Sequence, residues 1–361
     1  MSHTYEMSFS VLYPLFVGGC VYHIKKLPTP TILIETMKKV RPTIMCSVPL
    51  IIEKVYKSSV VPTIAHSRVL SWMKEHTPKI LYFLIGKRLY ATFGGRLKFF
   101  GIGGNLKFSR IGGSKLDPTV EDFLIKAKFP YAIGYGLTET APLITNACVG
   151  KTKVGSIGVP AYNVQVKLDN VNPETGEGEI IAKGDNVMLG YYKDPERTRQ
   201  VLSDDGWFRT NDLACLDEKG RYFIKGRLSN MILGASGENI YPEEIEQVIN
   251  NIDDVNESII IPRDGKLVAL VTFNENAIDW NQEGEDEFFR KIEEYKSMIL
   301  NIVNKNVNRT SKVSAVQILR EPFEKTATRK IRRFKYKEKT SDEVSQQDTE
   351  DKSKGTASSE K

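Results

Sequence analysis

Hydrophobic positions in the first part of the chain follow helix-like and strand-like spacing in turn. In residues 29–56, TPTILIETMKKVRPTIMCSVPLIIEKVY, a helix-length segment precedes the short apolar run TIMCSVP, a pattern typical of buried α/β structure. Residues 66–92 are predicted to be helical, with four apolar side chains as core anchors. These anchors are Trp72, Leu81, Leu84 and Leu89.

Two similar strand-then-glycine units follow, LKFFGIGG at residues 97–104 and LKFSRIGGS at residues 106–114. Neither is a complete GxGxxG motif that opens a helix, so the pattern does not favour a dinucleotide site. The next stretch, DPTVEDFLIKAKF, is predicted to be a helix with Asp117 as its N-cap and Pro118 in its first turn.

From residue 154 the pattern changes to short alternating segments separated by Gly, Asn and Pro, for example GEGEIIAKG and GRYFIKGR. This spacing predicts a mostly antiparallel β subdomain. Helical and strand-like segments alternate again from residue 229, which indicates a small α/β unit. We therefore divide the chain into an α/β region, a β-rich region, a small α/β domain and a polar tail expected to be disordered. Their bounds are 1–153, 154–228, 229–335 and 336–361.

Composition and charge narrow the class of protein. Hydrophobic residues make up 40% of the 361 residues, enough for a sizeable core, and the formal net charge is only +6. Whole-chain charge thus gives no argument for nucleic-acid binding, and any such surface must be local. The four cysteines are far apart and show no zinc-ligand spacing, which favours reduced thiols in a cytoplasmic protein. They are Cys20, Cys46, Cys148 and Cys215.

The stretch GYGLTETAP at residues 134–142 carries the first candidate chemistry. Two glycines flank Tyr135, which allows a close backbone approach to a ligand. Thr138 offers a hydroxyl for a phosphate, and Glu139 offers a carboxylate for Mg²⁺. The same residues are equally consistent with a polar turn after a strand, so this stretch alone does not decide between the two.

The segments that follow carry a specific resemblance. GEIIAKGDNVMLGYYKDPERT, GWFRTNDLACLDEKGRYFIKGRLSNMI and GENIYPEEIE occur in this order, with SHTYE at the start of the chain and KTATRKIRR near its end. Together they resemble the adenylate-forming (AMP-binding) superfamily of acyl-CoA synthetases, adenylation domains and luciferases, over about residues 1–335. The resemblance implies an α/β fold with a partial large adenylate-forming domain. That domain would combine a parallel-sheet layer with an antiparallel β subdomain, and a small mobile C-terminal α/β domain would follow it.

The same resemblance implies an activity. Members activate a carboxylic acid with ATP to give acyl-AMP and pyrophosphate, and the thiol of coenzyme A then attacks the acyl-adenylate. SHTYE resembles the aromatic motif of long-chain fatty-acid ligases, so the implied substrates are a fatty acid, ATP and CoA, with Mg²⁺. A cytoplasmic protein is expected, and a fatty substrate is compatible with peripheral contact at the inner face of a membrane. No nucleic-acid partner is expected.

Family roles carry over to matching positions of this sequence. Thr138 would contact phosphate, Glu139 would hold Mg²⁺, and the ring of Tyr135, beside Gly136, would stack on the adenine base. Asp212 would accept hydrogen bonds from the ribose hydroxyls, and Arg227 would also reach the ribose. The backbone that would line the adenine pocket belongs to Gly112, Gly113 and Ser114.

The resemblance also assigns roles in the small domain. Lys330, within TATRKIRR, would reach the α-phosphate and the substrate carboxylate during adenylation. Ser229 would be the hinge for domain rotation, and the loop around Gly237 would face the pantetheine tunnel. His3 is a candidate for the acyl side of the pocket. The other cations of this stretch are expected to be solvated or to steer phosphates. They are Lys325, Arg329, Arg332 and Arg333.

The sequence departs from the family pattern in three places. It has Thr-Asn-Asp at residues 210–212, where Thr-Gly-Asp is common, and Ser229 where the hinge is usually Asp or Lys. The phosphate-binding loop expected upstream of SHTYE is absent, so the β- and γ-phosphates would lose their backbone cradle. We therefore expect little or no ligase activity from this chain alone.

Three alternatives stay open at this stage. The chain could belong to an adenylate-forming enzyme for another acid, including one that loads a carrier protein. It could be a non-catalytic module that binds AMP or CoA. The basic stretch at residues 325–339 could instead bind nucleic acid or a membrane.

Overall fold

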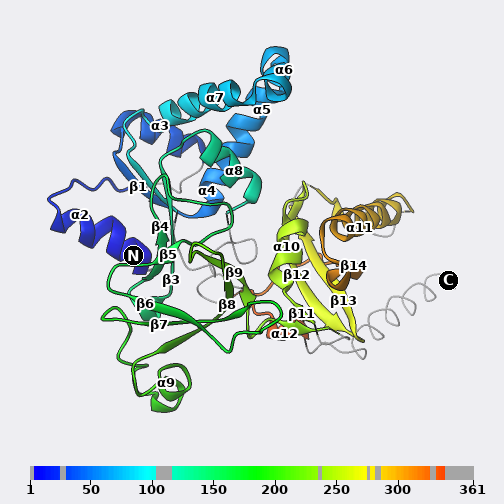
Figure 1. Ribbon diagram of the computed structural model, residues 1–361. Helices are drawn as coiled ribbons and strands as arrows, with labels where there is room; N and C mark the ends of the chain where they lie inside the picture. Colours follow the sequence, from blue (N-terminus) through cyan, green and yellow to red (C-terminus); the bar gives the residue numbers. More distant parts are fainter. Residues whose placement is uncertain are drawn as a thin grey trace, which may run out of the picture. The chain divides into compact units, whose positions relative to one another are not determined.

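The computed structural model in Figure 1 contains two compact units. It describes residues 4–24, 30–102, 116–234, 238–274, 277–280, 286–325 and 331–337. Among these residues, the large unit ends at Ser229 and the small unit begins at Asn230.

The large unit contains a five-stranded mixed sheet with the order β1-β2-β3-β4-β5. Strands β1 to β3 are parallel, and β4 and β5 continue the sheet in antiparallel fashion. The bounds are β1 Ile44–Ser47, β2 Phe99–Ile102, β3 Tyr131–Gly136, β4 Leu143–Ala147 and β5 Val159–Pro160. The fold class predicted from the sequence, an α/β layer built on parallel strands, is confirmed.

Helices α3, α4, α7 and α8 place buried apolar residues in one core beside β1 and β2, and Figure 1 shows α3 and α4 close to β1. The rings of Phe93, Phe100 and Phe129 meet edge to face within this core, with centroids 5.5 to 5.6 Å apart. The bounds are α3 Pro30–Val40, α4 Pro49–Val55, η2 Tyr56–Val60, α5 Val61–Ala65, α6 Arg68–His76, α7 Pro78–Thr92 and α8 Pro118–Lys126.

The predicted N-cap of α8 is confirmed. The Asp117 carboxylate accepts hydrogen bonds from the backbone N–H groups of Thr119 and Val120, at 2.8 and 3.1 Å. The Asp117 N–H itself donates to the Glu53 carboxylate of α4 at 2.9 Å. The cap therefore fixes the start of α8 and also joins it to α4.

The predicted helical region at residues 66–92 is two helices, because Thr77 separates α6 from α7, whose first residue is Pro78. Two of its four expected core anchors are buried: Leu81 is 1% exposed and Leu89 is 3% exposed. The other two are not, since Trp72 is 55% exposed and Leu84 is 46% exposed. Their placement in the core was wrong: Leu84 lies on the exposed one of two apolar faces of α7, and Trp72 lies on α6, which has no buried residue. Neither of these helices, nor any other in the described part of the chain, is long and apolar enough to cross a membrane.

A second sheet, with the order β6-β7-β8-β9, is antiparallel throughout, which confirms the predicted β subdomain. The strands are β6 Gln165–Asp169, β7 Gly178–Lys183, β8 Phe208–Leu216 and β9 Tyr222–Arg227, with helix α9 at Pro195–Val201. The early segment of this region, β5, belongs to the mixed sheet instead, because it pairs with β4.

The N-terminal segment is helical from Thr4 to Phe16, with a π-helical stretch in its middle. Its parts are α1 Thr4–Glu6, η1 Met7–Leu12 and α2 Tyr13–Phe16. The rings of Tyr5 and Phe9 lie 5.3 Å apart between centroids, as expected for side chains four positions apart on a helix.

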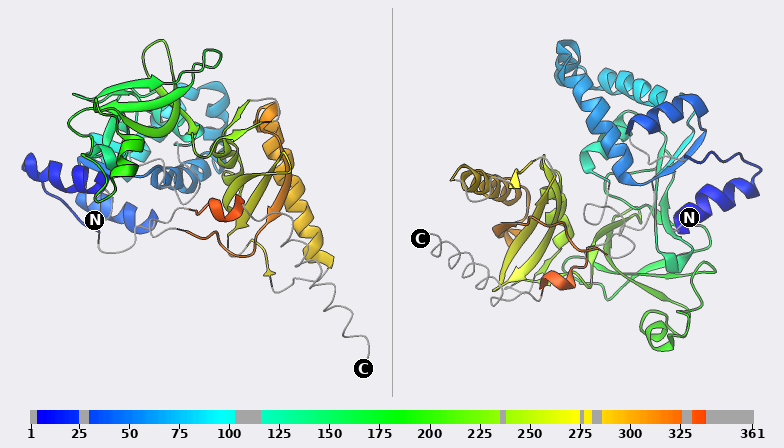
Figure 2. Two further views of the ribbon diagram at one scale, coloured as in Figure 1. Left: turned by 90° about the horizontal axis from the view of Figure 1, so that it is seen from below. Right: turned by 180° about the vertical axis from the view of Figure 1, so that it is seen from behind.

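The small unit has a three-stranded sheet with the order β12-β13-β14, in which β12 and β13 form an antiparallel hairpin and β14 pairs parallel to β13. Ile260, Ala269 and Val271 face helices α10 and α11, whereas Ile259 and Leu270 face the opposite side. Both faces are thus covered, which explains the continuous apolar runs in this part of the sequence. The bounds are β10 Ile232–Leu233, β11 Asn239–Ile240, α10 Pro242–Asn250, β12 Val255–Arg263, β13 Lys266–Phe273, α11 Asp286–Asn306, η5 Arg309–Ser311, β14 Val313–Ile318 and α12 Phe334–Lys337. The left view in Figure 2 shows α11 running along this sheet.

Two cations expected to be solvated are paired with buried carboxylates. The Arg333 guanidinium makes a two-pronged ion pair with Glu246, which is fully buried, and one of the two bonds is 2.6 Å long. Lys325 Nζ lies 2.6 Å from the carboxylate of Glu257, which is 1% exposed. The expectation of a solvated or phosphate-steering role was therefore wrong for these two residues, because buried carboxylates require a partner.

Candidate active site

The residues after β3 form a tight turn that returns directly as β4. A Cβ atom on Gly136 would lie 1.6 Å from the carbonyl oxygen of Pro142, so only glycine fits at this position. The buried Thr140 hydroxyl holds the turn, since it accepts from the Leu137 N–H at 3.0 Å and donates to the Pro142 carbonyl at 2.9 Å. The glycine is thus explained by the close approach of the chain to itself.

Thr138 and Glu139 are presented by this turn. Thr138 is exposed, and the Thr4 hydroxyl of α1 donates to its oxygen at 3.3 Å. Glu139 is half-buried and accepts a hydrogen bond from the Tyr191 hydroxyl at 3.1 Å. Burial and the neighbouring carboxylate raise the pKa of Tyr191, so its hydroxyl remains a donor. The Tyr191 hydroxyl therefore fixes the position of one carboxylate oxygen of Glu139.

Asp212, Arg227 and Tyr135 form one hydrogen-bonded group. Asp212 and Arg227 are direct cross-strand partners on β8 and β9, and Arg227 Nε donates to Asp212 Oδ1 at 2.8 Å. The Tyr135 hydroxyl donates to the other oxygen of Asp212 at 2.7 Å. Burial, followed by the charge of Asp212, raises the pKa of Tyr135 well above its usual value, so the phenol keeps its proton.

The exposure of these three residues differs. Tyr135 is 1% exposed and Asp212 is 3% exposed, whereas the Arg227 side chain is 23% exposed. Arg227 Nη2 is buried and has no hydrogen-bond partner among the described residues. A buried guanidinium N–H without an acceptor is costly, so this atom marks a place where a ligand oxygen could be accommodated. The Tyr135 ring could stack on an adenine base only after the residues that now cover the ring had moved away from it.

Two residues near this group differ from the family pattern, Asn211 and Ser229, and they are hydrogen-bonded to each other. Asn211 has a φ of 62°, in the left-handed region that favours Gly and tolerates Asn. Its side-chain amide donates to the Ser229 hydroxyl at 2.9 Å. Asn211 therefore supplies the backbone conformation of the more common glycine and also contacts the predicted hinge residue, which is the last residue of the large unit.

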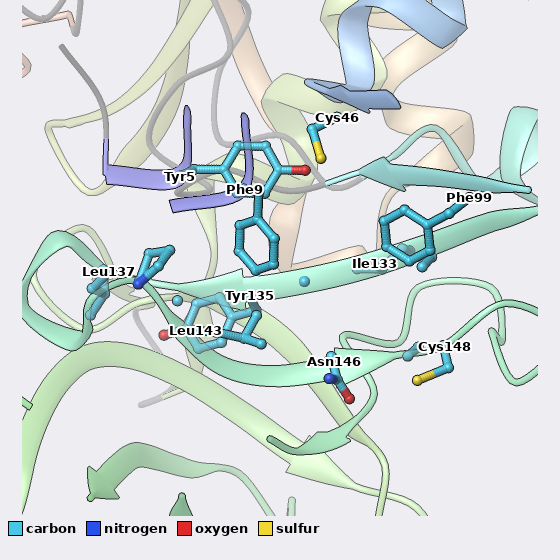
Figure 3. A pocket seen from close by; sticks show the side chains of 15 residues that line it. Tyr5, Phe9, Cys46, Phe99, Ile133, Tyr135, Leu137, Leu143, Asn146 and Cys148 are labelled. Carbon is cyan, nitrogen blue, oxygen red and sulfur yellow. The ribbon is translucent and has the colours of Figure 1, made fainter. Parts of the chain in front are cut away.

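An apolar cavity of about 90 Å³ lies along β3 and β4, next to the turn (Figure 3). Figure 3 shows the Tyr5 and Phe9 rings of the N-terminal helix above strand β3. No charged side chain is present among the described residues that line it. They are Tyr5, Phe9, Cys46, Phe99, Ala132, Ile133, Gly134, Tyr135, Gly136, Leu137, Pro142, Leu143, Asn146, Ala147 and Cys148.

Several predicted site residues lie outside the described part of the chain: His3, Gly112, Gly113, Ser114, Gly237 and Lys330. Lys325 and Ile331, on either side of the stretch that contains Lys330, pair as an antiparallel bridge. Together with the Arg333–Glu246 and Lys325–Glu257 ion pairs, this bridge fixes both ends of that stretch to the small unit.

The family model for AMP-binding enzymes matches residues 1–192, more than half of the chain. The chain belongs to the AMP-binding enzyme family. The match includes the N-terminal helix, the mixed sheet and the turn with Thr138 and Glu139. The membership expected from the sequence motifs is thereby confirmed.

Curated relatives of this AMP-binding enzyme include acyl-CoA ligases of different specificity. The peroxisomal long chain acyl-CoA synthetase 7 of Arabidopsis thaliana is 33% identical over 276 residues, covering 69% of this chain and 38% of that protein. The long-chain-fatty-acid–CoA ligase of Yersinia pestis is 45% identical over 133 residues, 36% of this chain and 23% of that protein. The feruloyl-CoA synthase of Amycolatopsis is 37% identical over 157 residues, 37% of this chain and 32% of that protein. The chain spans less than two fifths of each of these proteins.

Solved structures support the fold. The ATP-bound MatB of Rhodopseudomonas palustris has a TM-score of 0.64 at 22% identity, covering 93% of this chain and 58% of that chain. The MenE o-succinylbenzoate-CoA synthetase of Bacillus subtilis, in complex with its acyl-adenylate intermediate, has a TM-score of 0.68 at 18% identity. That match covers 93% of this chain and 59% of that chain.

Three residues of the site were missed by sequence reasoning. Tyr5 and Phe9 line the cavity, and Tyr191 orients Glu139. The SHTYE motif pointed to Tyr5, and Phe9 follows it by one helical turn, so a helical reading of the N-terminus would have found both. Tyr191 lies far from Glu139 in the chain, and no local signal links the two.

Proposed function

We propose that this chain forms the nucleotide- and acid-binding part of an acid–thiol ligase with an apolar, long-chain acid as its substrate. The reaction would join the acid and ATP into acyl-AMP with release of pyrophosphate, and then transfer the acyl group to CoA with release of AMP. The observation that carries this proposal is the uncharged cavity beside the turn of Thr138 and Glu139 in a member of the AMP-binding enzyme family.

The position of the cavity supports an apolar acid. Leu137 borders the cavity, and Thr138 and Glu139 are the next two residues. An acid whose hydrocarbon part fills the cavity would place its carboxylate near these polar side chains. Burial of the hydrocarbon supplies the binding free energy, at roughly 25 cal/mol per Å² of apolar surface. The long-chain relatives favour a fatty acid over the aromatic acids of other relatives.

The group around Asp212 supports a nucleotide. Asp212 accepts one hydrogen bond on each oxygen, and a carboxylate can accept more. Ribose hydroxyls would therefore donate to Asp212, and Arg227 Nη2 would find an acceptor on the ligand. Glu139 would contribute a carboxylate oxygen to a magnesium ion whose other ligands would be phosphate oxygens and water, the oxygen ligands that Mg²⁺ prefers.

The small unit would supply the remaining groups. Lys330 would neutralise charge that develops on the α-phosphate during adenylation, and loss of such a donor costs on the order of 100- to 1,000-fold in rate. Rotation at Ser229 would then withdraw Lys330 and bring the loop around Gly237 to the CoA side. One lysine would thus serve only the first half-reaction.

Binding of a non-hydrolysable acyl-adenylate analogue, measured by calorimetry, tests the proposal. A hexadecanoyl analogue is expected to bind more tightly than a benzoyl analogue, because its longer hydrocarbon chain removes more apolar surface from water against the uncharged lining. Asp212→Asn, which keeps the size of the side chain, is expected to weaken both by about 10- to 100-fold, since bonds to a charged acceptor are lost. Glu196→Gln, an exposed carboxylate change on α9, is the control and should leave binding unchanged.

Measurements of acyl-AMP and thioester formation distinguish a catalytic ligase from a module that only binds its ligands. This chain alone is expected to form little or no acyl-AMP from ATP and acid, and Lys330→Ala should reduce any such formation further, while thioester formation from supplied acyl-AMP and CoA is retained. Tight analogue binding without any thioester product would identify a binding module. Equal affinity for the benzoyl and hexadecanoyl analogues would contradict an apolar long-chain substrate, and no binding of either would overturn the proposal.

A further inference from the structure

The loop of residues 184–191, which lies between β7 and α9, is hydrogen-bonded to the turn between β3 and β4. We call this segment the bracing loop. The side-chain amide of Asn186 donates to the carbonyl oxygens of Thr140 and Leu143, at 2.9 and 2.8 Å. A single side chain therefore ties the middle of the turn to the first residue of β4.

The turn is strained at Ala141. This residue has a φ of 45°, in the left-handed region that residues with a Cβ disfavour. Such positions persist only where the surrounding structure fixes them, and they concentrate at functional sites. Asn186 holds carbonyl groups on both sides of Ala141, so it supplies support where the backbone needs it.

Asn186 also has an unfavourable feature. Its Oδ1 atom is buried and has no hydrogen-bond partner among the described residues, and an unpaired buried acceptor lowers the stability of a protein. A residue with a purely structural role is expected to satisfy both ends of its amide. The imbalance indicates that Asn186 serves the conformation of the turn more than the stability of the fold.

The bracing loop holds Glu139 by its backbone and by its carboxylate. The Met188 N–H donates to the Glu139 carbonyl at 2.8 Å, and the Tyr191 hydroxyl donates to the carboxylate at 3.1 Å. Helix α9 holds Tyr191 in turn. Thr198 Oγ1 accepts from the Tyr191 N–H at 2.9 Å, and the guanidinium carbon of Arg197 lies 4.9 Å from the centre of the Tyr191 ring. The position of the Glu139 carboxylate is thus coupled to α9.

We propose, on the basis of the magnesium role given to Glu139 under the proposed function, that Asn186 and Tyr191 are positioning residues for this carboxylate. Asn186 fixes the backbone of the turn, and Tyr191 fixes one carboxylate oxygen, so that the other oxygen is directed to the metal ion. Mg²⁺ demands near-ideal octahedral geometry, so a ligand that is already held in place binds it better. Neither residue is assigned a contact with the substrate.

Hydrogen exchange followed by mass spectrometry tests the bracing contact without any ligand. Asn186→Ala removes both donated bonds, and exchange in segments 137–143 and 186–191 is expected to become about tenfold faster or more. Gln200→Ala is the matched control, because it removes an exposed amide on α9 that bonds to no side chain or backbone group in the described part of the chain. Exchange that accelerates equally across the large unit would identify a general structural role and contradict the proposal.

Nucleotide binding tests the effect on Glu139. Calorimetry with ATP in Mg²⁺ and in EDTA gives two Kd values, and their ratio isolates the contribution of the metal. Asn186→Ala and Tyr191→Phe are each expected to lower this ratio by about tenfold, since a ligand of the metal is no longer held. Tyr192→Phe, which removes the hydroxyl of an 88% exposed side chain, should leave it unchanged.

A double-mutant cycle separates positioning from general destabilisation. In a Glu139→Ala background, Tyr191→Phe should have no further effect on the ratio, because it acts only through that carboxylate. An equal effect of Tyr191→Phe with and without Glu139 would overturn the proposal, and so would unchanged exchange in both segments of Asn186→Ala. Failure of the parent chain to bind ATP, or binding that Mg²⁺ does not alter, would count against the proposed function. The exchange experiment contains no ligand, so it would then decide the bracing role alone.

Discussion

At the residue scale, the two positions where the sequence departs from the family pattern, Asn211 and Ser229, are in direct contact. Asn211 occupies a left-handed backbone position, and its amide donates to the hydroxyl of Ser229. The carbonyl of Asn211 also accepts from the Leu228 N–H at 3.0 Å, and its own N–H donates to the buried Glu179 carboxylate at 2.9 Å. The residue before the candidate ribose ligand is thus tied to the junction between the units.

Substitution of Asn211 tests this backbone argument. Asn211→Ala is expected to lower the free energy of unfolding of the large unit by about 1 kcal/mol or more, because Asn tolerates the left-handed region through hydrogen bonds of its side chain and Ala has none to offset the strain. Asn211→Gly should cost less. Urea unfolding followed by Trp207 emission measures both. Ser229→Ala, which removes only the hydrogen bond, is the control. Equal losses for Ala and Gly would show that the left-handed position imposes no constraint.

At the element scale, a buried carboxyl group connects α8 to β3 and to the loop before β5. Glu121 of α8 is 1% exposed, and it accepts from the Gly155 N–H at 2.7 Å and from the Tyr131 hydroxyl at 3.2 Å. Burial, only partly offset by these bonds, raises the pKa of Glu121 from its ordinary 4.5 to about 7. Periodicity placed Glu121 on α8 but could not show that it is buried.

The Glu121 pKa makes stability depend on pH. Between pH 4.5 and about 7, the folded state keeps a proton on Glu121 that the unfolded state has lost. The contribution of this proton to the free energy of unfolding is therefore complete below pH 4.5 and is lost as the pH rises through 7. The loss amounts to about 3 kcal/mol at most. Glu121→Gln should remove it, so the stability difference between parent and variant should shrink or reverse with rising pH.

Chemical denaturation from pH 4.5 to 8 measures this difference. Asp122→Asn, a substitution of the neighbouring partly exposed carboxylate that pairs with Lys126 on the same helix, corrects for general charge effects. A difference between parent and Glu121→Gln that does not change with pH would mean that Glu121 ionises normally in the folded protein.

At the scale of the whole molecule, each unit has its own core. The mixed sheet with its helices and the β6–β9 sheet fill the large unit, and the two faces of the β12–β13–β14 sheet fill the small unit. Independent cores predict independent unfolding transitions. The Arg333–Glu246 pair belongs to the small unit alone, because Glu246 also accepts from the Ile260 N–H of β12 at 2.7 Å.

Arg333→Met should destabilise only the small unit, by about 3 to 5 kcal/mol, because Glu246 would be left buried without its partner. The double change Glu246→Leu with Arg333→Met should recover most of this loss. Trp280, which packs 5.6 Å from the Phe288 ring, reports on the small unit, and Trp207 reports on the large unit. A simultaneous shift of both emission transitions would contradict independent unfolding.

The sequence by itself determined the fold class, the order of elements and family membership, because periodicity, turn residues and short motifs are local. It also predicted the Asp117 cap and candidate site residues such as Thr138, Glu139 and Asp212, but it did not identify Tyr5, Phe9 and Tyr191. The tertiary structure decided which apolar residues are buried, as Trp72 and Leu84 show, and which cations are paired, as Lys325 and Arg333 show. It also revealed the contacts of Tyr135 with Asp212 and of Asn211 with Ser229. Burial and pairing depend on what lies across from a residue in space, and such neighbours are distant along the chain.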